Sequence, residues 1–239
     1  MPNLKTQING LFIFATFLSW ALVSEATEDY SLKAFSASYE IDWQGGLSLN
    51  GSTLRELKKD DKGHWTFQSK ASALFASVAE SSQFLWQNQL PIPLDYHFKR
   101  SVLGKKRIAH VSFDWESLTV TNTVENKPWK MSISNGVQDK LSYQLLLQKD
   151  LSNGLTEFNY TVADGGKLKE YKFTVDGTEI IEAPIGTYKS IRVKRLRDNN
   201  NTRQTFIWFA PALDYQIIKL HQVEKKDKAY TLLLKELKL

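Results

Sequence analysis

The stretch FSASYEIDW, from Phe35 to Trp43, alternates between apolar and polar side chains. In an extended chain, Phe35, Tyr39 and Trp43 lie on one face, and Glu40 and Asp42 lie on the other. A period of two residues is typical of a β-strand with one buried face. This stretch therefore predicts a strand, and it sets the pattern for much of the chain.

Alternating runs recur after this stretch, and the segments between them are rich in Gly, Asn, Asp and Pro, as turns require. Asp164-Gly165 lies between two alternating runs, and so does Asp176-Gly177. Asp and Gly tolerate positive φ, so both pairs suit hairpin turns. Strands do not alternate with helices, so a parallel sheet is disfavoured. We predict a mainly β fold, a strongly curved antiparallel sheet or incomplete β-barrel of about 12–14 strands with one amphipathic helix packed on it.

One segment departs from this period. In NGVQDKLSYQLLLQKDL, Val137, Leu141 and Leu145 recur every four residues, and no Gly or Pro follows before Leu151. This spacing places apolar side chains on one face of a helix. We therefore predict a helix near 137–151 that stops at Asn153-Gly154. The Ala- and Ser-rich stretch ASALFASVAESS leaves a second short helix and a strand equally open.

The N-terminus has the composition of a secretory signal. MPNLKTQING carries one cation, Lys5, and the apolar run LFIFATFLSWALV is followed by SEA. The run is shorter than the about 20 residues that a transmembrane helix needs. We predict a signal peptide over 1–26 that is cleaved after Ala26, a single all-β domain over 27–239, and a periplasmic location. A retained membrane anchor stays open as an alternative.

Cysteine and charge restrict the classes of partner. The chain has no Cys, which excludes thiol catalysis and cysteine-based metal sites and indicates that the protein is not a lipoprotein. The net charge is +5, but cations and acids are interleaved in RELKKDDKGHW, and KSIRVKRLRDNNNTR alternates like one solvated strand face. We expect no nucleic acid partner, with weak contact to an anionic membrane surface as an alternative to a plain solvated surface.

Neither the histidines nor any known catalytic motif predicts a reactive or metal-binding site in this chain. His97 and His110 could face each other across neighbouring strands beside Asp95, but a metal site needs three or four convergent ligands. The chain also lacks a G-x-S-x-G elbow, a Walker A loop and the dinucleotide-binding glycine pattern. The sequence therefore predicts no metal, no cofactor and no catalytic residue.

The stretch FIWFA, from Phe206 to Ala210, is apolar on both faces of its predicted strand. Both faces need cover, from the helix, from other parts of the protein, from a partner or from a ligand. A concave side that is not completely filled would form an apolar cavity, which is a common ligand site in barrels. The candidate lining residues are Tyr39, Trp43, Phe84, Trp86, Phe113, Trp115, Phe206, Trp208 and Leu220.

Several segments resemble a known family. They are VQDKLSYQLLLQKDL, YTVADGGKLKEYKFTVDGTEIIEAPIGTYKSIRVKR, IWFAPALDYQIIKL, FSASYEIDWQGGLSLNGS and VSFDWESLTVTN. Over Phe35 to Leu239 the chain resembles the exported bacterial proteins grouped as domain of unknown function 3108. The resemblance implies an incomplete antiparallel β-barrel wrapped over a helical lid, similar to periplasmic lipoprotein carriers, and it supplies no catalytic residue. The matching positions are Gln138, Asp139, Leu141, Gly186, Trp208, Pro211 and Tyr215, whereas Tyr215-Gln216-Ile217 stands where such families often carry a Leu-Pro pair.

Three functions follow from these observations. The first is a non-catalytic binding or carrier module for a lipid, an acyl chain or a lipoprotein. The second is an envelope scaffold with a filled core that binds an envelope protein, and the third is a hydrolase acting on envelope glycans or lipids. Seven Trp, nine Tyr and thirteen Phe are more aromatic residues than we expect a filled barrel of this size to need, which favours the first.

Overall fold

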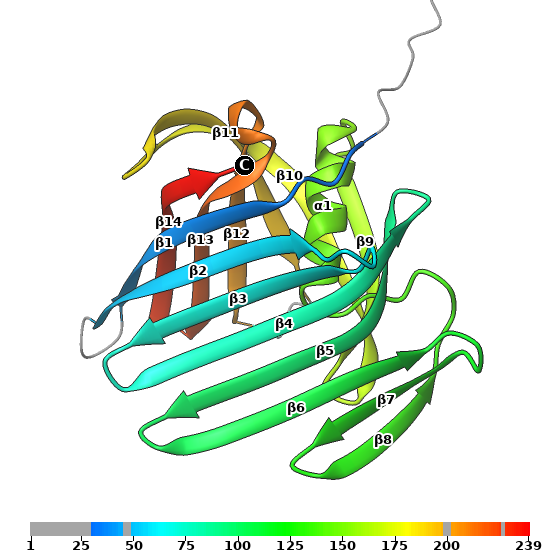
Figure 1. Cartoon of the computed structure of the whole chain (residues 1–239). Coiled ribbons are helices and arrows are strands. Elements are labelled where there is room, and N and C mark those ends of the chain that lie inside the picture. Colours follow the sequence, from blue (N-terminus) through cyan, green and yellow to red (C-terminus); the bar gives the residue numbers. More distant parts are fainter. Residues whose placement is uncertain (1–29, 45–48, 198–201, 226–227) are drawn as a thin grey trace, which may run out of the picture.

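The computed structural model describes residues 30–44, 49–197, 202–225 and 228–239. The predicted signal peptide and its cleavage site lie outside these residues. The described residues form a curved antiparallel sheet of 14 strands with one helix on its concave side (Figure 1). The strands are β1 (Phe35–Gln44), β2 (Leu49–Lys59), β3 (Trp65–Ala73), β4 (Ala76–Gln87), β5 (Leu90–Val102), β6 (Lys105–Asp114), β7 (Thr119–Val124), β8 (Lys127–Ser132), β9 (Glu157–Asp164), β10 (Lys167–Ala183), β11 (Gly186–Leu196), β12 (Gln204–Ala210), β13 (Gln216–Lys225) and β14 (Lys228–Lys238).

The strand order is β8-β7-β6-β5-β4-β3-β2-β1-β14-β13-β12-β11-β10-β9. Strands that follow each other in the chain are neighbours, except β8 and β9, and the added pairing of β1 with β14 joins the two halves of the sheet. The edge strands β8 and β9 do not pair, so the sheet curves like a barrel but stays open along one seam. The chain between these edges carries the helix α1 (Ser142–Ser152) into the concave side (Figure 1). The predicted fold class is confirmed.

The helix begins later than the spacing of apolar residues predicts. Gln138 is extended, because its N–H donates to Thr161 O (2.9 Å) and its carbonyl accepts from Ala163 N (2.8 Å) of β9. Asp139 then accepts hydrogen bonds from the next free N–H groups of the chain, and the helix follows at Ser142. Val137 and Leu141 are buried, but ahead of the helix. The helix ends at Ser152, next to the predicted stop.

The stretch 71–82, for which the sequence leaves a helix and a strand open, is a hairpin. It contains the end of β3, a turn and the start of β4. Across the two strands, Ala71 pairs with Val78 and Ala73 pairs with Ala76. Within the described residues, no helix is long and apolar enough to cross a membrane.

The core lies between the concave face of the sheet and α1. Leu145, Leu147 and Leu151 of the helix are buried. The ring of Tyr143, in the first turn, packs on the rings of Tyr171 (5.2 Å between centroids) and Phe173 (5.7 Å) in β10. The helix thereby fills a part of the concave side with aliphatic and aromatic side chains, at the end where its apolar face meets β9 and β10.

The protein itself covers the second face of the FIWFA stretch. Trp208 pairs with Lys219 of β13, on the face opposite to Ile207, and is only 5% exposed. The ammonium group of Lys219 lies over its ring, 4.6 Å from the centroid. The far end of β10 contacts β13 and β14, which are not its neighbours in the sheet, and Ile185 N donates to Leu234 O (3.2 Å). The β10–β11 hairpin therefore folds back beside these strands and shields their apolar side chains.

Truncation of one leucine tests the packing of the helix. Leu147 is completely buried, so Leu147→Ala should lower the free energy of unfolding by about 2–5 kcal/mol, because it removes packed atoms and leaves a cavity. The matched substitution Leu74→Ala, at a leucine that is 73% exposed in the β3–β4 turn, should change it by less than about 0.5 kcal/mol. Urea denaturation, monitored by tryptophan fluorescence, measures the free energy of unfolding of both variants. Equal losses would contradict a helix packed in the core.

Candidate binding site on the concave face

Apolar side chains continue along the concave face beyond the core on three adjacent strands, β1, β14 and β13. Residues that pair directly across antiparallel strands point to the same side of a sheet. Tyr39 and Leu234 form such a pair, and both are buried. The next pairs along the same face define what we call the apolar strip: Ile41, Trp43, Leu220, Tyr230 and Leu232.

The apolar strip is less covered than the core beside it. All five of its side chains are partly exposed. The rings of Trp43 and Tyr230 stack on each other, with centroids 5.9 Å apart and planes 7° apart. The strip thus offers a preformed apolar and aromatic surface on the inner side of the sheet, where small molecules bind in open barrels.

Asp139 fastens the start of α1 to the middle of the sheet. Its Oδ1 accepts hydrogen bonds from the N–H groups of Leu141 (2.7 Å) and Ser142 (2.9 Å), and Ser142 Oγ accepts from Asp139 N (2.9 Å). This reciprocal arrangement has the logic of a capping box. Its Oδ2 accepts from Ser82 Oγ of β4 (2.5 Å). The carboxyl group is completely buried, and this burial raises the pKa of Asp139 to about 6.

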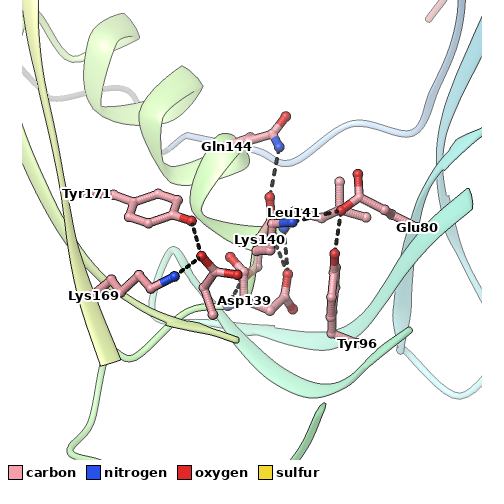
Figure 2. A network of polar contacts seen from close by, with 10 residues as sticks. Glu80, Tyr96, Asp139, Lys140, Leu141, Gln144, Lys169 and Tyr171 are labelled. Atoms are coloured by element: carbon pink, nitrogen blue, oxygen red, sulfur yellow. Dashed lines mark hydrogen bonds and ion pairs between the residues drawn. The ribbon is translucent and has the colours of Figure 1, made fainter. Parts of the chain in front are cut away.

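Two further carboxylates near the start of the helix are engaged by their own neighbours (Figure 2). Glu80 of β4 accepts a hydrogen bond from the Tyr96 hydroxyl and lies 3.6 Å from the ammonium group of Lys140. Asp164 of β9 accepts from Lys169 Nζ (2.7 Å) and from Tyr171. Burial raises the pKa of Asp164, but the hydrogen bond from Lys169 and the positive charges of Lys140 and Lys169 outweigh burial and hold this pKa below its usual range.

Three arginines reach into the concave side, and we call them the arginine cluster: Arg55 of β2, Arg195 of β11 and Arg197 directly after β11. Arg55 is 8% exposed, donates to Gln144 Oε1 of α1 (2.5 Å), and stacks its guanidinium group 4.9 Å from the centroid of the Phe67 ring. The guanidinium group of Arg195 lies 3.5 Å from the centroid of the Tyr171 ring. Both groups are therefore held in place by aromatic rings.

Arg197 completes the cluster. It donates to Thr205 Oγ1 (3.2 Å), and its Nε is buried without a hydrogen-bond partner. Burial raises the pKa of Tyr143; the charge of Glu80 also raises it, whereas the charges of Arg195, Arg55 and Arg197 lower it. Arg55 thus contacts α1 directly through Gln144, and Arg195 lies on the Tyr171 ring that packs against Tyr143 of the helix.

The structure corrects the prediction for this cluster. The pattern of KSIRVKRLRDNNNTR predicts one solvated strand face, but β11 sends Arg192 and Lys194 to one side and Arg195 to the other. Residues 198–201 of this stretch lie outside the described residues. Arg195 follows Val193 by two residues, and Val193 is completely buried. The apolar Val193 between cations was the signal that this face is the inner one.

The nine residues predicted to line a cavity do not come together. Trp43 and Leu220 belong to the apolar strip, whereas Tyr39, Phe84 and Phe113 are buried core residues. Trp86 packs beside Tyr30, and Trp115 stacks on Phe113 and donates to Pro93 O (2.6 Å). Phe206 and Trp208 lie on the opposite face of the sheet, because both alternate with the inward Ile207.

The positions that carry the family resemblance lie at turns and at the start of the helix. Asp139 caps α1 and Gln138 bridges to β9, as described above. Gly186 follows the β10–β11 turn with φ +135°, a conformation that side chains with a Cβ rarely adopt. Pro211 begins the short 3₁₀ helix η1 (Pro211–Leu213), and Tyr215 N donates back to Ala210 O (3.0 Å). These contacts are structural.

Asp95, His97 and His110 gather on the outer face of β5 and β6. Their ligand atoms lie within 4.8 Å of one another, and His110 Nε2 is 2.6 Å from Asp95 Oδ1. The two histidine rings are stacked, with centroids 4.3 Å apart and planes 3° apart. Nitrogen lone pairs lie in the ring plane, so parallel stacked rings direct them to separate points. This geometry does not suit a common metal ion.

Two pockets open at the ends of the sheet. One, of about 400 Å³, lies between the segment before β1, the end of α1 and the β12–β13 connection, with Tyr30, Gln148 and Tyr215 in its wall. The other, of about 430 Å³, lies at the open seam between Trp129 of β8 and Gly166 of the β9–β10 turn. None of the nine predicted lining residues contributes to either pocket.

Comparison with known families agrees with the resemblance. Residues 38–234 match the family described as Protein of unknown function (DUF3108). This chain belongs to the DUF3108 family. No curated protein matches it. The matched range includes all residues of the apolar strip and of the arginine cluster, and the family description brings no activity with it.

A solved structure shares the architecture of this DUF3108 protein. It is a beta-barrel-like protein of the DUF1849 family from Brucella abortus, with a TM-score of 0.57 and 9% sequence identity over 85% of this chain and 96% of that chain. A DUF1329 family protein from Desulfovibrio piger aligns with 8% identity over 86% of this chain and 85% of that one, at a TM-score of 0.27. The first likeness supports the barrel-like fold.

The buried carboxyl group of Asp139 should make stability depend on pH. Its pKa is about 6 in the folded protein and ordinarily 3.8, so the folded state keeps a proton that the unfolded chain loses as pH rises between these values. The free energy of unfolding of the natural protein, relative to Asp139→Asn, should therefore fall by about 2 kcal/mol from pH 4 to pH 7. Denaturation curves at several pH values measure this difference.

Asp60 provides a control of opposite sign. It lies in the exposed β2–β3 turn, where the backbone N–H of His64 holds the pKa of its carboxyl below the usual range. Relative to Asp60→Asn, the natural protein should gain a little stability as pH rises through the acid range. If the difference in stability between the natural protein and Asp139→Asn did not change with pH, the carboxyl group of Asp139 would not be desolvated.

Proposed function

We propose that this protein is a non-catalytic periplasmic module that binds or carries a lipid, an acyl chain or a lipoprotein on the concave face of its sheet. One observation carries the proposal. The inner face of the sheet continues past the helix as the apolar strip, whose side chains are only partly covered by the protein itself. Exposed apolar surface within a concavity is the usual character of a small-molecule site.

The shape of the sheet supports this role. A closed barrel of this size limits access to its interior, but here β8 and β9 stay unpaired and the helix occupies only part of the concave side (Figure 1). A flexible chain could therefore enter along the seam or from the end of the sheet beyond the helix. The apolar N-terminal run, if it directs export, would place such a carrier between two membranes.

A second candidate function rests on the open edge of the sheet. β8 is an edge strand whose residues are mostly exposed, and the side chain of Trp129 is 64% exposed. Unpaired strand edges accept a strand from another protein, and aromatic residues anchor such contacts. An envelope protein that adds a strand at β8 would make this molecule a scaffold.

The hydrolase alternative has less to support it. The carboxyl group with the raised pKa belongs to Asp139, and both its oxygens accept hydrogen bonds from the protein's own groups inside the core. It is not available to a substrate. We therefore assign this carboxyl group a role in holding the helix, not a role as a general acid.

Native mass spectrometry tests the proposed function directly. The protein from Thr27 to Leu239, purified from a bacterial periplasm without detergent, should carry an additional mass that organic extraction removes and that is identified as lipid. Bare protein that also fails to bind added oleic acid or phospholipid would contradict the proposal. The search would then turn to a protein that binds the β8 edge.

Two neighbouring leucines of β14 provide a matched pair of variants. Leu232 belongs to the apolar strip, and Leu233 points to the other face of the same strand; both are partly exposed. Leu232→Asn should reduce the lipid-bound fraction several-fold, because it removes apolar contact area, whereas Leu233→Asn should leave it unchanged. Equal effects of the two substitutions would place the lipid elsewhere.

A further inference from the structure

We propose that the ligand on the concave face is an anionic amphiphile, whose carboxylate or phosphate headgroup is bound by the arginine cluster while its acyl chain lies on the apolar strip. This inference rests on the proposed function, since it names the headgroup of the same ligand. Its evidence is separate, because it comes from the charges on the inner face and not from the apolar side chains.

The arginine cluster has no counter-charge in the described part of the chain. No carboxylate oxygen among the described residues lies within 4.0 Å of Arg55, Arg195 or Arg197. By contrast, Arg192 on the opposite face of β11 is paired with both Asp176 and Glu179. The three arginines of the cluster thus differ from Arg192 in having no carboxylate partner among the described residues.

Three carboxylates of the surrounding strands are already engaged by other groups. Glu80 holds Tyr96 and Lys140, Asp164 holds Lys169 and Tyr171, and Glu224 accepts from Arg203. These contacts leave several cations in one region without compensation. Removing a guanidinium group from water is unfavourable unless an anion pairs with it.

The cluster is built to present its charges inward. Arg55 is more than nine-tenths buried, and its guanidinium group is held between Gln144 and the Phe67 ring. Arg195 is held against the Tyr171 ring, and Arg197 keeps a buried Nε with no partner. Guanidinium groups with fixed orientation and free donors bind carboxylate and phosphate oxygens in two-point contacts.

The strand register places the cluster beside the apolar strip. Arg197 donates to Thr205 of β12, Thr205 pairs with Gln222 of β13, and Gln222 pairs with Tyr230 of the strip. Two strand spacings separate Thr205 from Tyr230, which is about 10 Å. One molecule with an anionic end and a chain of several carbons can therefore contact both regions, which favours a lipid over a free inorganic ion.

Binding of three probes that share one acyl chain tests this inference. Oleic acid and oleoyl lysophosphatidic acid carry an anionic headgroup, and oleyl alcohol is neutral. In native mass spectrometry titrations, the two anionic lipids should bind the natural protein about tenfold or more tightly than oleyl alcohol, because hydrogen bonds to charged groups are stronger than those to neutral ones. Inorganic phosphate at the same concentrations should not bind.

Substitutions on the two faces of β11 provide the control. Arg195→Met should weaken the affinity for oleic acid about tenfold and leave the affinity for oleyl alcohol unchanged. Arg195→Lys, which keeps the positive charge, should weaken the affinity for oleic acid less than Arg195→Met does. Arg192→Met, which removes an ion-paired arginine from the opposite face, should leave the affinity for both lipids unchanged. Thermal unfolding of each variant shows that the fold is retained.

The outcomes separate this inference from the proposed function. Equal affinity for oleic acid and oleyl alcohol in the natural protein would overturn the anionic headgroup and leave lipid binding intact. If inorganic phosphate bound tightly and prevented oleic acid from binding, the anion bound by the arginine cluster would be a free phosphate and not a lipid headgroup. If none of the three lipids binds, the proposed function fails together with its headgroup.

Discussion

The hydrogen bond between Ser82 and Asp139 connects the only segment that spans the open seam to the middle of the described sheet. The strands on either side of that segment, β8 and β9, do not pair, and the backbone hydrogen bonds of Gln138 fasten the segment only to β9, on one side of the seam. The same carboxyl group also caps the helix. Asp139 therefore links the start of the helix to β4, on the far side of the seam, while Gln138 holds it to β9.

Because the helix is held at β4 and β9, it leaves another part of the inner face uncovered. Its leucines and Tyr143 fill the space toward β9 and β10, and the apolar strip on β1, β13 and β14 stays accessible. The uncovered region has two chemical characters, aliphatic and aromatic at the strip and cationic at the arginine cluster. This division resembles the division of an anionic lipid into a chain and a headgroup.

The sequence allowed the architecture to be predicted because the pattern of the strands is local. The alternation from Phe35 to Trp43 and the four-residue spacing from Val137 to Leu145 distinguish strand from helix without knowledge of the fold. The start of the helix was less accurate, because Gln138 bonds to β9, a partner that is distant in the chain. The site was predicted only in part: Trp43 and Leu220 lie in the apolar strip, while Phe206 and Trp208 face the other way.

By itself, the sequence determined the class of fold, the presence of one helix and the membership of the DUF3108 family. Alternation shows that a strand has two different faces, but it does not show which face is the inner one, because that depends on how the whole sheet curves. Only the tertiary structure decided that Arg195 points to the inner face of β11, whereas Arg192 points to the outer face, where Asp176 and Glu179 pair with it. Whether an arginine has a carboxylate partner likewise depends on which distant segments the fold brings together, so the local sequence pattern does not predict it.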